Sequence, residues 1–497
     1  MHIHTGKLGF LNPKGYISDL SFLWIVPLLI LLAMFFATQN TEGILFPAWC
    51  ASISCLLALK SARYNPLSFV SVCALVHLIS YPIAATLNVI SAETAIYEPF
   101  LWEATPLAMW ACTLGMAGLA LGTVIASYIY KTAPGKENSD IGPSPVVNGI
   151  LVFTAIPIVL AKLYLGIYFH SQITGQFNME NAYRFAFLDY IIIFSYSGIY
   201  LQICRYCKTK TVFDLLWALF LITTSVLIWV PSGSRDQILR TIVIAFLAFW
   251  AYEKRTEARL RILLVSFLSI MFVAASMQFY RNTAKHQGDT TTVEKLSIIA
   301  DTMSGTSMYE LLFSEDSYSI YARRFADYVT TGWFIMTVPD TSPHRYFEGM
   351  QYWPVLLLPK FMRPKLPPEV LQDTAYMGYS ESGYGWLNSN EGSVPTMILG
   401  DCYLRFGWAG IFIIMFFISL LLRKIDMFLT KPGLYKKIVW TMMMILGWKT
   451  LTQGTTTQYF ILFTRTFVIC IIAAILAAKL LGRKKYGKII SSGIRPD

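Results

Sequence analysis

The chain has 497 residues, of which 55% are hydrophobic, 15% are aromatic and only 14% are charged. Soluble domains carry about 25% charged residues, so the composition argues against a water-soluble enzyme, a disordered chain and a secreted disulfide scaffold. A net charge of +11 can accompany nucleic-acid binding, but in membrane proteins it reports lysine and arginine retained in cytoplasmic loops. We therefore predict an all-α polytopic membrane protein with no nucleic-acid partner.

Apolar runs of the length needed to cross a bilayer recur along the whole chain. At about 1.5 Å per residue, a helix needs about 20 residues to span about 30 Å of hydrocarbon. About twelve transmembrane helices are predicted, at residues 20–37, 44–59, 66–90, 105–130, 146–169, 187–204, 212–230, 236–252, 260–280, 406–422, 438–451 and 459–481. The runs at 44–59 and 438–451 are the shortest. Residues 1–19 are polar, and we expect no cleaved signal peptide.

The connecting segments alternate in charge. Lysine and arginine cluster in every second one, at 7–14, 60–63, 131–136, 205–210, 254–261, 423–437 and 479–495. The segment 91–104 instead contains three glutamates and no cation. Positively charged loops stay in the cytoplasm, so we expect a multi-pass protein with both termini in the cytoplasm.

One connection differs from the others, because a long polar segment separates the ninth and tenth predicted helices. It contains two possible amphipathic helices, at 293–312 and 317–334, followed by a stretch rich in Pro, Gly and Tyr at 341–392. A loop this long is uncommon unless it carries function. The predicted parts are a cytoplasmic N-terminus (1–19), membrane helices one to nine (20–280), an extracytoplasmic cap loop (281–392), helices ten to twelve (393–482) and a cytoplasmic C-terminus (483–497).

Five cations fall inside or at the ends of the predicted helices, and the topology places all of them in the outer half of the membrane. They are Lys162, Arg240, Arg405, Lys449 and Arg465. Each costs about 2.5–3.5 kcal/mol at mid-bilayer. One interpretation is that each cation reaches the outer surface or pairs with an acid such as Asp189, Asp236 or Asp401. The other is a cationic pocket for a membrane-embedded anion, with Arg235 and Arg281 at its rim, because arginine favours bidentate phosphate contacts.

Three stretches resemble bacterial oligosaccharide repeat-unit polymerases. They are Pro-Ser-Gly-Ser-Arg at 231–235, Leu-Pro-Lys-Phe-Met-Arg-Pro-Lys-Leu-Pro at 358–367, and Pro-Thr-Met-Ile-Leu-Gly-Asp-Cys-Tyr-Leu-Arg-Phe-Gly-Trp-Ala-Gly at 395–410. The second resembles the family's Pro-Arg-x-x-Trp-Pro-x-Lys-Pro run, with Lys360 and Arg363 standing where arginine and tryptophan are expected. The third resembles the segment that returns the family's chain to the membrane. With the large outer loop, the resemblance covers residues 212–422.

The resemblance implies a Wzy-type O-antigen or exopolysaccharide polymerase, a membrane glycosyltransferase of GT-C-like fold. Such enzymes transfer a growing glycan from undecaprenyl diphosphate onto a lipid-linked oligosaccharide repeat unit at the outer face of the cytoplasmic membrane. Enzymes of this family act in polysaccharide biosynthesis, including that of lipopolysaccharide. The resemblance therefore also implies membrane lipid and a chain-length regulator protein as partners. The family works without metal or other cofactor, and the sequence contains no HExxH motif or His/Cys cluster that predicts a metal site.

For this chemistry the leaving diphosphate needs fixed cations and the acceptor hydroxyl needs a general base. The diphosphate-binding candidates are Arg235, Arg240, Arg281, Arg405, Lys449, Arg465 and Lys162. The candidate bases are Asp401, Glu391, His344 and His286, although Asp401 could instead neutralise Arg405 at i+4. The glycan-binding candidates are Arg345, Arg363, Tyr384, Trp386 and Tyr403.

Two other functions stay open from the sequence. An O-antigen ligase would use the same lipid diphosphate donor and transfer the glycan to a lipid A core or a protein. A transporter or flippase for lipid-linked oligosaccharides would favour charged residues through the full membrane depth and internal repeats. The large outer loop and the clustering of cations in the outer half favour the polymerase.

Overall fold

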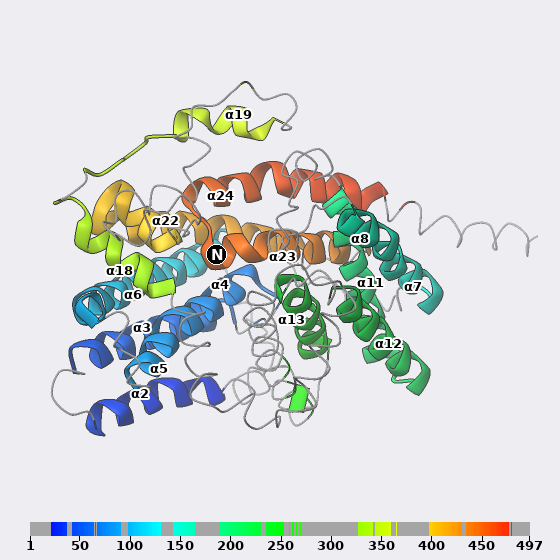
Figure 1. Cartoon of the computed structure of the whole chain (residues 1–497), viewed down its shortest axis with the longest axis horizontal. Helices are drawn as coiled ribbons and strands as arrows, with labels where there is room; N and C mark the ends of the chain where they lie inside the picture. The colour runs from blue at the N-terminus through cyan, green and yellow to red at the C-terminus, as the bar shows by residue number, and fades with distance from the viewer. Residues whose placement is uncertain are drawn as a thin grey trace, which may run out of the picture.

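The computed structural model describes residues 21–36, 42–63, 67–90, 98–130, 143–164, 188–229, 235–252, 327–340, 343–358, 397–429 and 434–476, with a few isolated positions. Regular structure in these ranges is entirely helical (Figure 1). Seven helices are long and apolar enough to cross a membrane: Gly43–Ser61, Phe69–Val89, Glu103–Ile129, Pro145–Lys162, Val212–Trp229, Ile398–Leu429 and Thr456–Leu476. The chain is a polytopic membrane protein.

The helices follow the apolar runs of the sequence. Their bounds are α2 Ile25–Phe36, α3 Glu42–Ser61, α4 Phe69–Leu78, α5 Ala84–Ile90, α6 Glu98–Ile129, α7 Pro145–Phe153, α8 Ala155–Tyr164, α11 Leu188–Thr209, α12 Val212–Trp229, α13 Arg235–Tyr252, α18 Asp327–Thr337, α19 Trp353–Leu357, α22 Ile398–Leu429, α23 Leu434–Gln453 and α24 Thr456–Ile461. Shorter turns are η1 Ser21–Trp24, η2 Ile79–Ile83, η4 Met350–Tyr352 and η6 Leu462–Thr466. The turns η2 and η6 are both π-helical. Because a π-helical turn continues the helix that contains it, α4, η2 and α5 form one continuous helix.

Every predicted span except the ninth, residues 260–280, overlaps one of these helices; most of the ninth lies outside the described residues. The two shortest predicted spans lie within longer helices, since α3 and α23 each have 20 residues, but α11 and α23 are not among the seven long apolar helices. The apolar parts of α2 and α13 are shorter, at Ile25–Phe36 and Gln237–Trp250. The predicted total of twelve spans therefore stays a prediction.

The helices pack in two groups. One contains α2 to α6 with α18 and α22, and the other contains α7, α8, α11, α12 and α13. The helix α23 contacts α11 of the second group and α4 of the first, and Figure 1 shows it between them. Its Trp440 donates a hydrogen bond to the Leu67 carbonyl and lies against the ring of Tyr200 on α11.

In the first group, α6 and α22 approach each other through glycines of α6. A Cβ atom on Gly118 would lie 2.4 Å from the carbonyl oxygen of Phe412, and one on Gly122 would lie 2.5 Å from that of Phe416. Small residues spaced four apart allow two membrane helices to bring their backbones together. The two helices therefore meet backbone to backbone.

The helix α18 comes from the predicted cap loop, where a helix at 317–334 was expected. The described helix is Asp327–Thr337, whereas the other expected helix, at 293–312, lies outside the described residues. Instead of resting on top of the bundle, α18 packs against α6 and α22. The hydroxyls of Tyr81 and Thr331 are 2.7 Å apart, and Asn88 donates to the Tyr328 hydroxyl at 2.5 Å. These contacts insert part of the loop between membrane helices.

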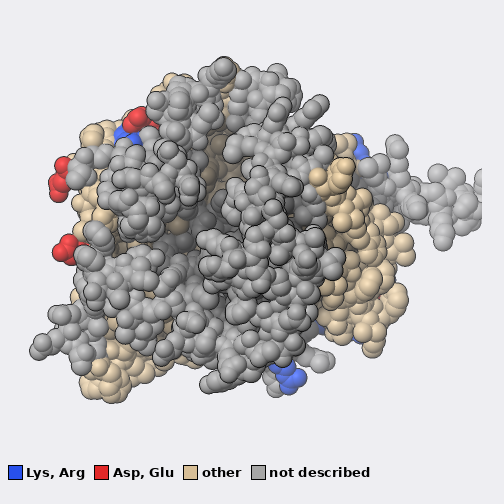
Figure 2. Space-filling view, in the orientation of Figure 1, with Lys and Arg blue, Asp and Glu red and all other residues tan. Residues whose placement is uncertain are grey.

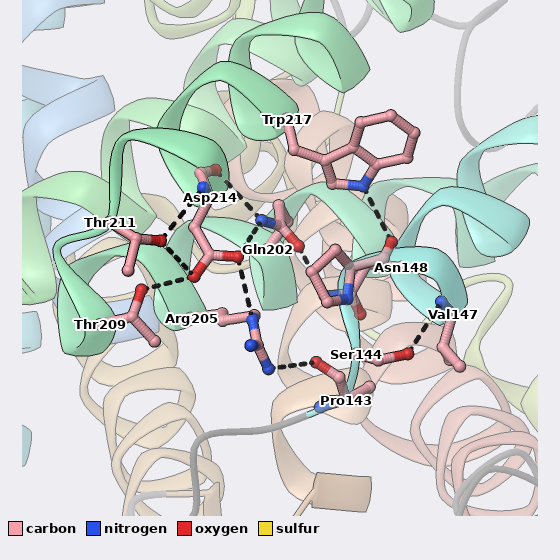
Figure 3. A network of polar contacts seen from close by, with 11 residues as sticks. Pro143, Ser144, Val147, Asn148, Gln202, Arg205, Thr209, Thr211, Asp214 and Trp217 are labelled. Carbon is pink, nitrogen blue, oxygen red and sulfur yellow. Dashed lines mark hydrogen bonds and ion pairs between the residues drawn. The ribbon is translucent and has the colours of Figure 1, made fainter.

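A buried polar network joins α7, α11 and α12 at the end predicted to be cytoplasmic (Figure 3). The carboxylate of Asp214 accepts hydrogen bonds from Arg205 Nε at 3.0 Å, Thr211 Oγ1 at 2.9 Å and Thr209 Oγ1 at 2.5 Å. Gln202 bridges Asp214 to Asn148 on α7. The network satisfies a carboxylate that would otherwise be buried without partners.

Charged side chains that are visible on one face of the molecule lie near its edges (Figure 2). In Figure 2 the acidic ones visible on this face gather along the left edge, where α18 and the start of α22 lie in Figure 1. Basic side chains also appear at the bottom and right edges. Large apolar side chains of the described helices are exposed, including Phe35 on α2, Leu216 on α12 and Phe417 on α22, and we expect these surfaces to face lipid.

Candidate functional site

A buried ion pair lies in the first turns of α22. Nε of Arg405 is 3.2 Å from each carboxylate oxygen of Asp401, one helical turn earlier, and the two side chains are only 1% and 2% exposed. Two charges removed from water in this way must be satisfied by one another and by further hydrogen bonds. The i, i+4 pairing considered from the sequence is therefore present.

The remaining hydrogen bonds of the carboxylate come from the start of α24. Asp401 Oδ2 accepts from the backbone N–H of Thr456 at 2.9 Å and from its hydroxyl at 2.5 Å. A carboxylate at a helix N-terminus is stabilised by the unsatisfied N–H groups there. Asp401 thus ties α22 to α24, and its role as a base stays a prediction.

The segment 343–358, which we name the outer segment, wraps the other side of Arg405. Tyr346 N–H donates to the Arg405 carbonyl at 3.1 Å, and Arg405 Nη1 donates to the carbonyls of Glu348 at 2.7 Å and Tyr346 at 3.4 Å. Arg345 N–H donates to the Leu404 carbonyl at 3.0 Å. A single buried guanidinium therefore organises the outer segment against α22.

The helix α22 changes conformation immediately after Arg405. Phe406 and Gly407 have non-helical backbone angles, and Gly407 has φ of +64°, a region that glycine adopts at little steric cost. This break divides α22 into a buried stretch, residues 398–405, and a long apolar stretch that begins where the tenth span was predicted. The Arg-Phe-Gly-Trp sequence thus marks a helix break.

His344 lies at this break. Its Nδ1 is 3.3 Å from the Leu404 carbonyl oxygen. A carbonyl oxygen only accepts, so the tautomer that makes this hydrogen bond has its proton on Nδ1 and, in the neutral ring, its lone pair on Nε2. Nε2 has no hydrogen-bond partner among the described residues. A Cβ atom on Gly407 would lie 3.6 Å from Nε2, so the glycine keeps the space beside this nitrogen open. Of the two candidate bases that the structure describes, Asp401 and His344, the histidine is the one with an unoccupied acceptor position.

Arg465 lies in the π-helical turn η6, in the same helix as Thr456. Its Nη1 donates to the carbonyl of Leu356, in the outer segment, at 3.1 Å. Its Nε is buried and has no hydrogen-bond partner in the part of the chain that the structure describes. Among the described residues no carboxylate pairs with it. The outer segment is also held to this helix by Trp353, whose ring stacks on Phe460 at 4.3 Å.

The five outer cations are therefore not all gathered at one place. Arg405 and Arg465 share the junction of α22, α24 and the outer segment. Lys162, which is buried, lies on α8, and Arg240 lies on α13, both in the second group of helices. Lys449 lies on α23 and Arg235 begins α13, but their side chains lie outside the described residues.

Only two of the remaining predicted site residues, Arg345 and Tyr403, lie in the part of the chain that the structure describes. Arg345 is half-buried in the outer segment. Tyr403 is buried and its hydroxyl donates to the Val338 carbonyl at 3.1 Å, so this geometry favours packing over glycan contact. Several predicted residues lie outside the described ranges: Arg281, His286, Lys360, Arg363, Tyr384, Trp386 and Glu391.

Sequence reasoning missed residues that lie far from Asp401 along the chain. Thr456 follows the N-cap residue Thr455, whose hydroxyl accepts from Gln458 N–H at 3.3 Å. The run of three threonines after Gly454 is a recognisable helix start, but nothing in it indicates a partner on α22. In the part of the chain that the structure describes, no three His, Cys, Asp or Glu side chains are grouped to hold a metal ion.

Residues 136–431 match a family model described as a domain of unknown function, DUF8712. The chain belongs to the DUF8712 family. No curated protein and no solved structure matches it.

The DUF8712 region runs from just before α7 to just after α22. It therefore contains the Asp401–Arg405 pair, His344 and the whole outer segment. Arg465 and Thr456, which complete the junction from the other side, follow the region. The site is thus assembled from the DUF8712 region and the helix that comes after it.

Proposed function

We propose that this DUF8712 protein is a lipid-linked oligosaccharide polymerase of the Wzy type, in the bacterial cytoplasmic membrane with both termini in the cytoplasm. It transfers a growing glycan from undecaprenyl diphosphate onto the next lipid-linked repeat unit at the outer face. The apolar helices, the alternating loop charges and the resemblance at 395–410 support this proposal.

The observation that carries the proposal is the state of Arg465. Its side chain is partly buried near the predicted outer end of its helix, donates to one neutral carbonyl and has no carboxylate partner among the described residues. An arginine in a membrane helix is costly unless it is paired or functional. A diphosphate supplies the missing negative charge, and the lipid tail attached to it stays in the bilayer.

In this proposal the Nε2 of His344 accepts the proton of the acceptor hydroxyl as its oxygen attacks the anomeric carbon of the donor glycan. The bond from that carbon to the diphosphate oxygen breaks, and undecaprenyl diphosphate leaves with its charge held by Arg465. Fixed donors aimed at developing charge need no reorganisation during the reaction. The Asp401–Arg405 pair holds the outer segment, which carries His344, in place.

Lys162, Arg235 and Arg240 lie on α8 and α13, in the other group of helices, and have no part in this anion site. Arg281 and Lys449 stay candidates for its rim on the strength of the sequence alone.

The test is complementation of a deletion strain, with glycan length read from a gel and membrane protein level read from an immunoblot. Arg465→Ala should abolish polymer at normal protein level, and Arg465→Lys should restore part of it. The matched control is Arg423→Ala, which removes a half-buried guanidinium bonded to Ser127 near the other end of α22. Full-length polymer from Arg465→Ala would refute the anion site. If the deletion strain leaves lipid A core wholly uncapped instead of carrying single repeats, the protein is a ligase.

A further inference from the structure

Two neighbouring aromatic side chains of the outer segment are turned away from the protein. Tyr346 is 56% exposed and Phe347 is 69% exposed. Both rings meet Phe406 edge to face, at centroid distances of 6.2 Å and 5.1 Å. The three rings form one cluster at the helix break of α22, which we name the aromatic platform.

The platform is held in its outward orientation by the backbone. Tyr346 has φ of +43°, a left-handed conformation that is unfavourable for a bulky residue. Its N–H donates to the Arg405 carbonyl and its own carbonyl accepts from Arg405 Nη1, so the buried ion pair fixes the strained residue from both sides. Strain maintained by surrounding structure is characteristic of functional sites.

Polar groups surround the exposed rings. Glu348 has an exposed carboxylate side chain and donates its backbone N–H to the Arg345 carbonyl at 2.8 Å. Arg345 is half-buried beside it, and the ring of His344 lies 6.0 Å from that of Tyr346. An aromatic face beside an imidazole, with a carboxylate and a guanidinium on neighbouring residues of the same segment, complements a pyranose, which has an apolar C–H face and a rim of hydroxyls. A lipid acyl chain would gain nothing from the charged edge.

We propose that Tyr346 and Phe347 form a stacking subsite for a pyranose ring of the acceptor glycan. The Glu348 carboxylate accepts hydrogen bonds from the hydroxyls of this sugar, and the Arg345 guanidinium donates hydrogen bonds to them. This inference rests on the proposed function and extends it, because a sugar stacked on Tyr346 lies next to the imidazole of His344. The subsite then selects the acceptor, whereas Arg465 holds the donor diphosphate.

The test is a binding measurement that requires no turnover. The probe is the repeat-unit oligosaccharide released by mild acid from the lipid carrier of the organism that encodes the chain. Its saturation-transfer signals are recorded with the full-length protein in nanodiscs. The double variant Tyr346→Leu with Phe347→Leu keeps the apolar surface and removes the flat rings, and it should weaken binding by about tenfold. The control is Tyr128→Ala, which removes a ring that is 80% exposed at the far end of α6.

Each outcome decides for or against the subsite. Weaker binding by both the leucine variant and the corresponding alanine variant, with the control unchanged, supports it. Binding that survives in the leucine variant but not in the alanine variant overturns it, because apolar insertion then explains the exposed rings. No binding by the wild-type protein also overturns it. If polymer in cells still depends on Arg465 in those cases, the proposed function stands without the subsite.

Discussion

Replacement of Asp401 by asparagine should destabilise the protein strongly, because Arg405 would remain buried without a counter-charge. The asparagine side chain has almost the same shape, but its NH₂ group would face either the guanidinium or the Thr456 N–H, which are both donors. Removing one partner of a buried ion pair costs about 3–5 kcal/mol. We expect a loss of that size from Asp401→Asn and also from Arg405→Met.

The double variant separates coupling from simple loss of packing. With both charges removed, neither is buried alone, so Asp401→Asn with Arg405→Met should cost no more than about the worse single change. The measurement is the thermal unfolding midpoint of purified protein, followed by tryptophan fluorescence, with equal extraction from membranes as a prerequisite. If the destabilisation of the double variant equals the sum of the single ones, the two side chains are not coupled and our reasoning is wrong.

Three further predictions concern backbone packing and buried polar groups. Gly122→Val should lower the free energy of unfolding by about 1–3 kcal/mol through overpacking of α6 on α22, whereas Gly43→Ala, with no atom within 4 Å of its Cβ, should leave the melting midpoint unchanged. Gly407→Ala should cost about 1–2 kcal/mol through its positive φ; an unchanged midpoint would contradict the helix break beside His344. Asp214→Asn should cost about 2 kcal/mol by weakening its charge-assisted hydrogen bonds, which a thermal melt measures and an unaltered melt would disprove.

The sequence predicted the helices well because a bilayer leaves only length and apolarity as requirements for a span. The pairing of Asp401 with Arg405 was also accessible, since their spacing alone places them on one helix face. The position of α18 was not, because an amphipathic pattern predicts a buried face without saying what covers it. Thr456 was out of reach for a related reason: its contact with Asp401 crosses 55 positions of the chain.

The glycines of α6 are a different case, since their signal was visible in the sequence. Gly118 and Gly122 form a Gly-x-x-x-Gly pattern within an apolar run, which is typical of close helix association in membranes. The pattern identifies one face of α6 and leaves the partner helix unspecified. Only the fold shows that α22, which comes almost three hundred residues later, is that partner.

This contact also limits how the hydrocarbon tail of the proposed lipid-linked substrate reaches the interior. Where two helices touch through their main chains, no side chain can rotate aside to open a gap between them. The contact between α6 and α22 therefore leaves no lateral opening to the bilayer. A lipid tail that enters from the bilayer must pass between other helices.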